Sequence, residues 1–256
     1  MIRAKKHLGQ HFLNDKNIAR KIVESLSGQT QNILEIGPGM GVLTEPLIHD
    51  TNKTVIAMDI DREAIAYLQQ RFPEYKTKFL LQDFLKSDLS SVFQEEFSVI
   101  GNFPYNISSQ ILFKVIENRL HIPELIGMFQ KEVAERIACK PGSKKYGILS
   151  VFSQAFFEPQ YLFTVHEHVF SPAPAVKSAV IKMTRRPHFT LSCDEGLFFT
   201  VVKTAFNQRR KTLRNSLKSI MTSPENHPIL QSRPEQLSVE EFCELTELVA
   251  AYQNPR

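Results

Sequence analysis

The chain has 256 residues, of which 42% are hydrophobic and 23% are charged, enough to bury a full α/β core and leave one smaller domain. No apolar run approaches the roughly 18 residues needed to cross a bilayer, and the N-terminus lacks an apolar signal-peptide core, so we expect a cytoplasmic protein. The three cysteines are far apart and without CxxC spacing, which argues against a disulfide framework and a metal site. A net charge of +4 is by itself weak evidence for a nucleic-acid partner.

Short apolar runs alternate with segments of helical periodicity through the first two-thirds of the chain. The expected strands are 32–37, 54–59, 77–81, 97–101 and 125–129. The expected helices are 42–49, 62–72, 108–118 and 131–138. Such alternation is typical of a parallel sheet with helices on both faces, and it predicts a doubly wound, Rossmann-like α/β fold.

The pattern changes in the last third of the chain. Two further strands, 160–165 and 176–183, flank a proline-rich connector and should join the sheet late as an antiparallel addition, which makes seven strands. A linker is expected at 184–188, where the apolar periodicity stops. Beyond it only helical segments are found, at 197–206, 211–220 and 239–252, the last after a capping-box pattern at Ser238 and Glu241. We therefore predict two domains, 1–186 and an all-helical 187–256.

A glycine-rich turn, Glu35-Ile36-Gly37-Pro38-Gly39-Met40-Gly41, follows the first of these strands. Glycine is expected at Gly37 and Gly39 because a Cβ there would keep a cofactor away from the backbone. The spacing is GxGxG and not the GxGxxG of dinucleotide sites, and Pro38 removes an amide that a pyrophosphate would use. The turn therefore favours a ligand without phosphates.

Carboxylates end the next two strands. Asp59 is placed to accept from the ribose hydroxyls of an adenosine-containing ligand, and Asp83 to accept from the adenine amine, with Ile60 or Phe84 packed on the ring. Singly, Asp59 as a turn residue and Asp83 as a helix cap are equally good interpretations, but their register after successive strands favours a cofactor site. An NAD-dependent dehydrogenase shares these features, so they leave the chemistry open.

The motif after the fourth strand, Asn102-Phe103-Pro104-Tyr105, points to methylation of a planar amine such as adenine N6. The Asn102 side-chain oxygen and the Phe103 carbonyl can accept both amine hydrogens and favour a pyramidal nitrogen aimed at a methyl donor. Tyr105 would stack on the extruded base, a contact worth about 1–3 kcal/mol. A sulfonium donor carries the driving force, so positioning suffices without a strong base. The alternative is a simple proline turn with Tyr105 in the core.

The sequence closely resembles the ribosomal RNA adenine dimethyltransferase family, the enzymes linked to kasugamycin sensitivity, over almost the whole chain. The matching segments are Gly9-Gln10-His11-Phe12-Leu13, Glu35 to Gly39, Asp59, Gln82-Asp83, Gly101 to Ser108, Val169 to Ser178 and Ala205 to Lys211. The resemblance implies transfer of methyl groups from S-adenosylmethionine to N6 of two adjacent adenosines. These would lie in a hairpin loop near the 3′ end of small-subunit (16S) ribosomal RNA, within a nearly assembled subunit.

The resemblance also implies roles for individual residues. The cofactor would be lined by His11, Leu13, Gly37, Asp59, Asp83 and Asn102, and the residue pattern itself adds Gly39, Ile60 and Phe84. Phe170 would pack on the target base opposite Tyr105, with a core role as the alternative. The family often has Asn at the position of His11, Glu at Asp59 and Leu at Phe103, and the shorter Asp59 is expected to shift the ribose contact.

Basic residues are concentrated between 203 and 218, where no acidic residue occurs. They are Lys203, Arg209, Arg210, Lys211, Arg214 and Lys218. Such a stripe suits the backbone of RNA, although a solvated helix face is the simpler interpretation. The basic N-terminal arm, with Arg3, Lys5, Lys6 and His7, is expected to be flexible until RNA binds. We expect a monomer, since no heptad seam is visible.

Three other functions remain open at this point. A large-subunit RNA methyltransferase of the macrolide-resistance type shares both motifs, but it would act on naked large-subunit RNA. An RNA-binding assembly factor would keep ribosome assembly dependent on the chain even without catalysis, whereas the intact Asn102-Phe103-Pro104-Tyr105 motif argues against loss of activity. A small-molecule methyltransferase would leave the basic stripe and the helical domain unexplained.

Overall fold

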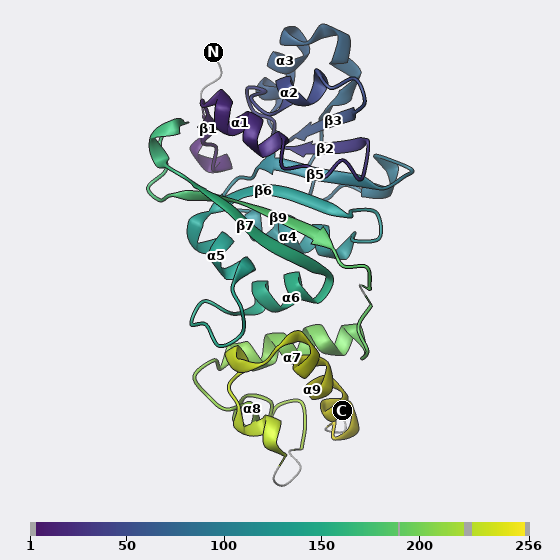
Figure 1. Ribbon diagram of the computed structural model, residues 1–256, viewed down its shortest axis with the longest axis vertical. Coiled ribbons are helices and arrows are strands. Elements are labelled where there is room, and N and C mark those ends of the chain that lie inside the picture. Colours follow the sequence, from purple (N-terminus) through teal and green to yellow (C-terminus); the bar gives the residue numbers. More distant parts are fainter. Residues whose placement is uncertain (1–3, 189, 223–226, 254–256) are drawn as a thin grey trace. The chain divides into compact units, whose positions relative to one another are not determined.

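The structure, a computed structural model, describes residues 4–188, 190–222 and 227–253. It divides into two compact units (Figure 1). The first contains Met1–Ala134 and Glu158–Arg185, and the second contains Glu135–Phe157 and Arg186–Arg256. Among the described residues, no helix is both long enough and apolar enough to pass through a membrane.

The first unit is built on a seven-stranded sheet with the order β4-β3-β2-β5-β6-β9-β7. The strands are β2 (Asn32–Ile36), β3 (Thr54–Asp59), β4 (Phe79–Leu81), β5 (Phe97–Asn102), β6 (Glu124–Gln130), β7 (Phe157–Val165) and β9 (Ser178–Arg185). The pairs β3–β4, β2–β3, β2–β5 and β5–β6 are parallel, and β9 runs antiparallel to β6. The expected doubly wound sheet and its late antiparallel addition are confirmed.

Helices pack on the sheet with their apolar faces. They are α1 (Lys16–Val23), α2 (Thr44–Ile48), α3 (Arg62–Arg71) and α4 (Ser108–Glu117). Helix α5 (Lys131–Ala138) follows β6 and continues from the first unit into the second. Alternate side chains of the strands, such as Ile33 and Ile100, form one buried cluster with Ile22 of α1 and Leu47 of α2. In Figure 1, α4 lies on the opposite side of the sheet from α1. The sheet is thus covered on both faces, as its continuous apolar strands require.

Two local features of the first unit differ from the sequence-based expectation. The strand expected at 77–81 begins only at Phe79, because Pro73–Lys78 forms a 3-10 helix with the proline at its start. The helix α1 was not expected at all. It begins at the N-cap Asp15, whose carboxylate accepts from the amides of Asn17 and Ile18 at 2.8 and 3.0 Å, a start signal that the sequence carries.

A second, two-stranded sheet joins the N-terminal segment to the proline-rich connector. Strand β1 (Phe12–Leu13) pairs antiparallel with β8 (Phe170–Ser171), with Leu13 opposite Phe170. This pairing brings together two segments that are more than 150 residues apart in the sequence, and it fixes the chain next to the carboxyl edge of the main sheet.

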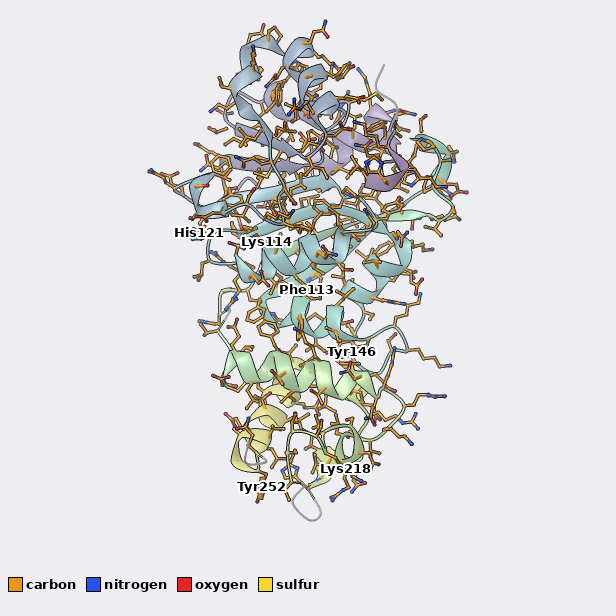
Figure 2. All side chains as sticks on the ribbon, turned by 180° about the vertical axis from the view of Figure 1, so that it is seen from behind. Phe113, Lys114, His121, Tyr146, Lys218 and Tyr252 are labelled. Carbon is orange, nitrogen blue, oxygen red and sulfur yellow. The ribbon has the colours of Figure 1, made fainter. Side chains whose placement is uncertain are left out.

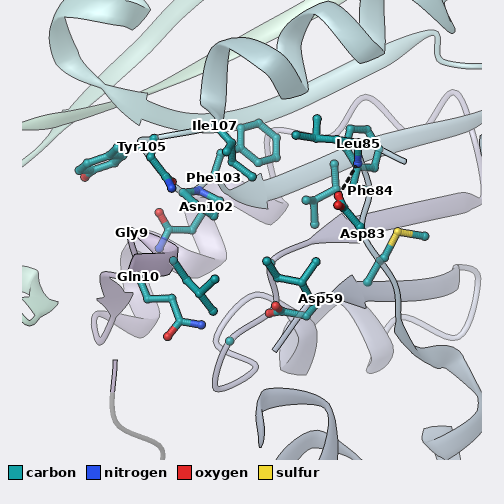
Figure 3. Close-up of a pocket in the computed structure, with 18 of the residues that line it drawn as sticks. Gly9, Gln10, Asp59, Asp83, Phe84, Leu85, Asn102, Phe103, Tyr105 and Ile107 are labelled. Atoms are coloured by element: carbon teal, nitrogen blue, oxygen red, sulfur yellow. Dashed lines mark hydrogen bonds between the residues drawn. The ribbon is translucent and has the colours of Figure 1, made fainter. Parts of the chain in front are cut away.

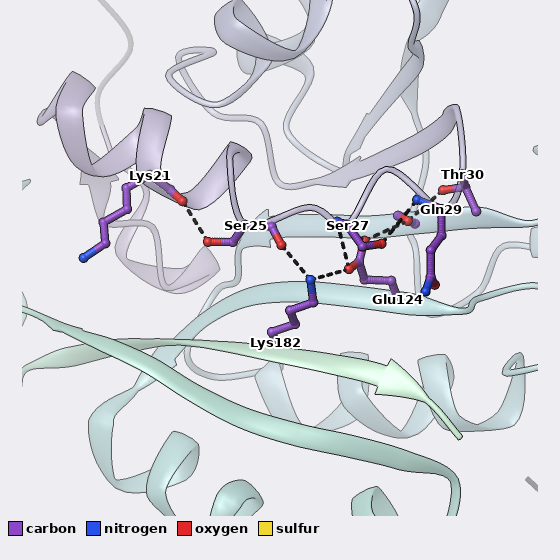
Figure 4. A network of polar contacts seen from close by, with 8 residues as sticks. Lys21, Ser25, Ser27, Gln29, Thr30, Glu124 and Lys182 are labelled. Carbon is purple, nitrogen blue, oxygen red and sulfur yellow. Dashed lines mark hydrogen bonds and ion pairs between the residues drawn. The ribbon is translucent and has the colours of Figure 1, made fainter. Parts of the chain in front are cut away.

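A buried carboxylate lies at the amino-terminal end of β6, on the side of the sheet opposite to its carboxyl edge (Figure 4). Glu124, at the start of β6, has no exposed side-chain surface and lies 2.9 Å from the Lys182 ammonium. It also accepts from the Ser27 amide at 3.1 Å and from the Ser98 hydroxyl at 3.3 Å, while Lys182 donates to the Ser25 carbonyl at 2.9 Å. The charge is therefore fully partnered, as a buried ion must be, and it ties the loop after α1 to β6 and β9.

The second unit is helical. It contains α6 (Ile148–Phe156), α7 (Glu195–Asn207), α8 (Leu213–Ser216) and α9 (Val239–Ala251). The capping box at Ser238 and Glu241 is confirmed, with bonds of 3.2 and 2.7 Å. The long helix expected at 211–220 is wrong, since only Leu213–Ser216 is α-helical. Tyr146, labelled in Figure 2, is buried within this unit near the ring of Phe206.

The second unit also corrects the predicted domain division, which assigned 135–157 to the first domain. The reason is the packing of α6. The ring of Phe152 meets Phe199 of α7 edge-on at 4.6 Å and Phe198 at 6.2 Å, so the buried face of α6 belongs to the helical core. Only the boundary between Arg185 and Arg186 lies close to the predicted one.

Candidate functional site

A pocket of about 850 Å³, partly open to solvent, lies at the carboxyl edge of the sheet in the first unit (Figure 3). Its lining comes from the turns after β2, β3, β4 and β5 and from the segment before β1. Parallel strands present their carboxyl ends at one edge, and ligands of doubly wound folds bind there. Eight predicted site residues of the cofactor set line the pocket: His11, Gly37, Gly39, Asp59, Ile60, Asp83, Phe84 and Asn102.

The glycine turn holds left-handed backbone at both predicted positions. Gly37 has φ +68° and Gly39 has φ +54°, values that L side chains rarely adopt. A Cβ on Gly39 would approach the Phe12 ring to 2.9 Å, whereas a Cβ on Gly37 would have no neighbour closer than 3.8 Å. Gly39 is therefore required by packing inside the protein, and the space beside Gly37 remains open for a ligand.

Asp59 is a buried carboxylate at the end of β3, only 9% exposed. One of its oxygens accepts from the Asp61 amide at 2.9 Å. Burial raises the pKa of Asp59, and hydrogen bonds from backbone amides, including those of Gly39 and Ile60, oppose the rise. Hydrogen bonds from hydroxyl groups would stabilise this buried carboxylate, and a ribose carries such hydroxyl groups.

Asp83 and its neighbours form the next wall of the pocket. The Asp83 carboxylate accepts from the Leu85 amide at 3.0 Å (Figure 3) and lies 3.5 Å from the Lys86 ammonium. The alternative expected for Asp83, a helix cap, does not match the structure, because the segment that Asp83 caps is a turn; the side chain also lines the pocket. Phe84 is buried and Ile60 is half exposed, so a planar ring would find apolar surface on both sides of this wall.

The Asn102 amide has a fixed orientation. Its nitrogen donates to the His11 carbonyl at 2.8 Å, so the side-chain oxygen remains an acceptor that faces the pocket. The Phe103 amide donates to the Met128 carbonyl at 3.3 Å, and the buried Phe103 ring packs edge-on against Phe129 at 5.2 Å. Asn102 is thus held by the segment before β1, and Phe103 is held by β6.

Tyr105 is held at its hydroxyl and at one face of its ring. The hydroxyl shares a hydrogen bond with the buried Ser178 hydroxyl, and the ring stacks on His11 with centroids 5.4 Å apart and planes 26° apart. Burial raises the pKa of Tyr105, with the Ser178 bond opposing it. Because the Pro172 carbonyl 2.8 Å from His11 Nδ1 can only accept, that nitrogen carries a hydrogen.

Two predicted site residues lie elsewhere. Phe170 is 4% exposed and packs with Leu13 and Val180 in the core cluster, so the predicted contact with the target base is replaced by the core role. The reason is its pairing with Leu13 in the β1–β8 ladder, which turns the ring inward. Leu13, predicted for the cofactor, instead lines a second, smaller pocket beside the glycine turn.

The described part of the N-terminal arm makes ion pairs and a helical turn. Lys5 lies 2.6 Å from Asp61 and 3.0 Å from Glu63, and Lys6–Leu8 forms a 3-10 helix. Arg3 lies outside the described residues. Gln10 and Asp61 were missed as functional candidates, although an aspartate two residues after a site carboxylate, directly before a helix, is a recognisable N-cap signal.

Glu35 of the glycine turn is completely buried and was not assigned a role. The Thr44 hydroxyl donates to it at 2.7 Å. Burial raises the pKa of Glu35 to about 8, with the Asp59 charge adding to the rise and the Thr44 bond opposing it. The side chain is therefore mostly protonated at neutral pH.

Comparison with known proteins identifies the family of the chain. The family model described as "Ribosomal RNA adenine dimethylase" matches residues 1–250. The chain belongs to this family.

Relatives of the dimethylase family extend the match. "Ribosomal RNA small subunit methyltransferase A" of Flavobacterium johnsoniae is 56% identical over 254 residues, covering 98% of this chain and 97% of the relative. The protein of the same name from Cytophaga hutchinsonii is 54% identical over 253 residues, covering 97% and 98%.

Solved structures share the fold of this dimethylase-family chain. A dimethyladenosine transferase from Plasmodium falciparum superposes with a TM-score of 0.79 at 24% identity, covering 95% of this chain and 99% of that one. The 23S rRNA methyltransferase ErmE superposes with a TM-score of 0.69 at 23% identity, covering 92% and 99%. At these identities the likeness establishes the fold alone.

The predicted basic stripe lies in the second unit of this dimethylase-family chain. Lys203, Arg210, Lys211 and Lys218 are exposed (Lys218 is labelled in Figure 2). Arg209 is partly buried: its guanidinium donates to the carbonyls of Ser143 and Lys144. Arg209 is thus used to hold the loop before α6, and its availability to RNA is reduced. Arg214 is half-buried.

Proposed function

We propose that this chain dimethylates N6 of two adjacent adenosines near the 3′ end of small-subunit ribosomal RNA, with S-adenosylmethionine as the methyl donor. The observation that carries the proposal is the fixed Asn102 amide. Its nitrogen is bound to the His11 carbonyl at 2.8 Å, so its oxygen is presented as an acceptor beside a pocket with an adenosine-type wall. The matched family and the names of the relatives support the same reaction.

The residues present suit S-adenosylmethionine. The Asp59 carboxylate would accept from the ribose hydroxyls, Asp83 would accept from the adenine amine, and Ile60 and Phe84 would enclose the ring. The space beside Gly37, where a Cβ would meet no protein atom closer than 3.8 Å, would admit the remainder. When bound, the cofactor supplies an electrophilic methyl group.

The chain itself acts on the target amine by positioning. The Asn102 oxygen and the Phe103 carbonyl accept the N6 hydrogens and align the nitrogen lone pair. Tyr105 would stack on the extruded base with the ring face that is not against His11. It would do so without Phe170, because Phe170 is buried in the core. As the N–C bond forms, the S–C bond of the donor would break with its electron pair going to sulfur, and the proton of the resulting cationic amine would leave to water.

The lysines and arginines of the basic stripe would bind the RNA backbone. We propose Lys203, Arg210, Lys211, Arg214 and Lys218 for this role, with a smaller contribution from Arg209. Because the target adenosines belong to small-subunit RNA, the partner would be the assembling small subunit. The chain would bind it as a monomer. Phosphate contacts of this kind predict affinity that falls steeply with salt.

The test is methyl transfer from labelled S-adenosylmethionine to undermethylated small subunits, with mass spectrometry of the product nucleosides. Dimethyladenosine is expected in small-subunit RNA, and Asn102→Ala should reduce its formation at least about a hundredfold, the range for a lost transition-state contact. Asn52→Ala, at an exposed turn, is the matched control. Transfer only to naked large-subunit RNA, or to neither RNA, would overturn the proposal.

A further inference from the structure

The Asp61 carboxylate is buried at the start of α3 and has no exposed side-chain surface. One oxygen accepts from the Lys5 ammonium at 2.6 Å and from the Glu63 amide at 2.9 Å, and the other accepts from the Gln10 side-chain nitrogen at 2.9 Å. The Glu63 bond is an ordinary N-cap. The other two bonds reach more than 50 residues back to the N-terminal segment.

These bonds close the N-terminal segment into a ring. The Gln10 side-chain oxygen accepts from the Lys5 backbone amide at 2.8 Å, so Lys5 and Gln10 are joined both to each other and to Asp61. The backbone between them makes a 3-10 turn that ends at Gly9, in the left-handed region with φ +64°. The part of the segment before His11 is therefore attached to the start of α3 through the Asp61 carboxylate, with Glu63 as a second partner of Lys5 at 3.0 Å.

The same segment is a wall of the pocket. Five consecutive residues, Leu8 to Phe12, line it, and the His11 carbonyl at its end receives the Asn102 amide. On the opposite side, the Asp61 backbone amide donates to the Asp59 carboxylate at 2.9 Å. Asp61 thus contacts the wall with its side chain and the proposed ribose acceptor with its backbone, without lining the pocket itself.

We propose that Asp61 is a positioning residue that closes the wall at 5–12 over the cofactor and so sets cofactor affinity. The proposal rests on the proposed function, since the ligand is taken to be of the S-adenosylmethionine type. A buried carboxylate is costly unless its partners are in place, so Asp61 favours the closed arrangement of Lys5 and Gln10. When only a fraction of molecules is closed, the apparent affinity falls by that fraction.

Asp61→Asn is the variant that separates this role from the helix cap. The asparagine oxygen still accepts from the Glu63 amide, because Asn is a good N-cap. Its amide nitrogen, however, cannot accept from Gln10, and of the two carboxylates that face Lys5 only Glu63, at 3.0 Å, keeps its charge. Lys5→Met removes the same ion pair from the other side. Asp50→Asn is the matched control, since Asp50 also pairs with a lysine and accepts a backbone amide, and it lies away from the pocket.

The measurement is equilibrium binding of S-adenosylhomocysteine to the full chain by calorimetry, without RNA, after urea unfolding has shown that each variant is folded. Asp61→Asn should bind about tenfold more weakly or worse, Lys5→Met should weaken binding in the same direction, and Asp50→Asn should match the wild type. Trypsin, followed by mass spectrometry, should cut after Lys5 and Lys6 faster in Asp61→Asn than in the wild type.

The two arms keep this inference separate from the proposed function. Binding by Asp61→Asn equal to the wild type would refute the role of Asp61. A wild type that binds no S-adenosylhomocysteine would refute the proposed function. Even then, equal cleavage by trypsin of wild type and Asp61→Asn would refute the closure, and faster cleavage of the variant would uphold it.

Discussion

Replacement of Glu35 by Gln should change how the stability of the first unit depends on pH. Glu35 is completely buried beneath the glycine turn, and burial raises its pKa from an ordinary value of 4.5 to about 8. The folded chain therefore keeps the Glu35 proton where the unfolded chain has lost it. Unfolding at neutral pH releases this proton, so rising pH favours the unfolded state.

The size of the effect follows from the two pKa values. Each pH unit between them lowers the free energy of unfolding by about 1.4 kcal/mol. With a folded pKa of about 8, the contribution of Glu35 falls by about 2.5 kcal/mol from about pH 5.5 to about pH 7.5. It is fully present below the unfolded pKa and is exhausted above the folded one. Glutamine is neutral and can still accept from the Thr44 hydroxyl, so it removes this dependence and keeps the contact.

The assay is urea unfolding of wild type and Glu35→Gln at these two pH values, followed by far-UV circular dichroism. The free energy of unfolding of the variant minus that of the wild type should increase by about 2.5 kcal/mol between them. Glu117→Gln, at an exposed position, controls for the loss of a carboxylate in general. A difference between variant and wild type that stays constant with pH would refute the reasoning, because it would mean that Glu35 is ionised in the folded chain.

Three further predictions concern the site and its support. Tyr105→Phe and Ser178→Ala should each lower kcat/KM a few-fold, and the double variant should be no worse than either. The double-mutant cycle should therefore give a coupling energy of about 1 kcal/mol. Additive losses would contradict the hydrogen bond between the two side chains. Phe170→Ala should lower the free energy of unfolding by about 3–5 kcal/mol, while Phe170→Leu should keep methyl transfer. If a stable Leu variant lost methyl transfer, this would show that Phe170 contacts the target base after all. Gly127→Ala should cost about 1–3 kcal/mol in urea unfolding, because its Cβ would lie 2.3 Å from the Phe103 ring, and added Phe103→Leu should recover part of it; no recovery would place the clash elsewhere.

The sequence was a good guide where local pattern and tertiary environment agree. Strand β3 and helix α5 match the predicted bounds, because each is a short run of clear periodicity between polar residues. Helix α6 was missed because six of its nine residues are apolar and its two serines are buried, so its polar residues do not mark an exposed face and a buried strand is equally plausible. The domain division failed for the same reason, because only the packing of Phe152 against α7 shows where that helix belongs.

At the site, residues that follow strands were predictable and residues set by long-range pairing were not. The turns after β2 to β5 converge at one edge by topology alone, so Gly37, Asp59 and Asn102 could be placed together from sequence. The inward orientation of Phe170 depends on pairing with Leu13, more than 150 residues earlier. The Ser178 hydroxyl on Tyr105 likewise depends on the antiparallel register of β9 with β6, which no local pattern reveals.

The composition of the second unit from two separate stretches has a consequence for engineering and for domain exchange. The backbone passes between the units three times, after Ala134, Phe157 and Arg185. A truncation at the last of these points would strip α6 of the rings that cover Phe152 and leave an apolar helix without its core. The helical unit is thus not a detachable tail, and a chimaera that transplants it must carry 135–157 along with 186–256.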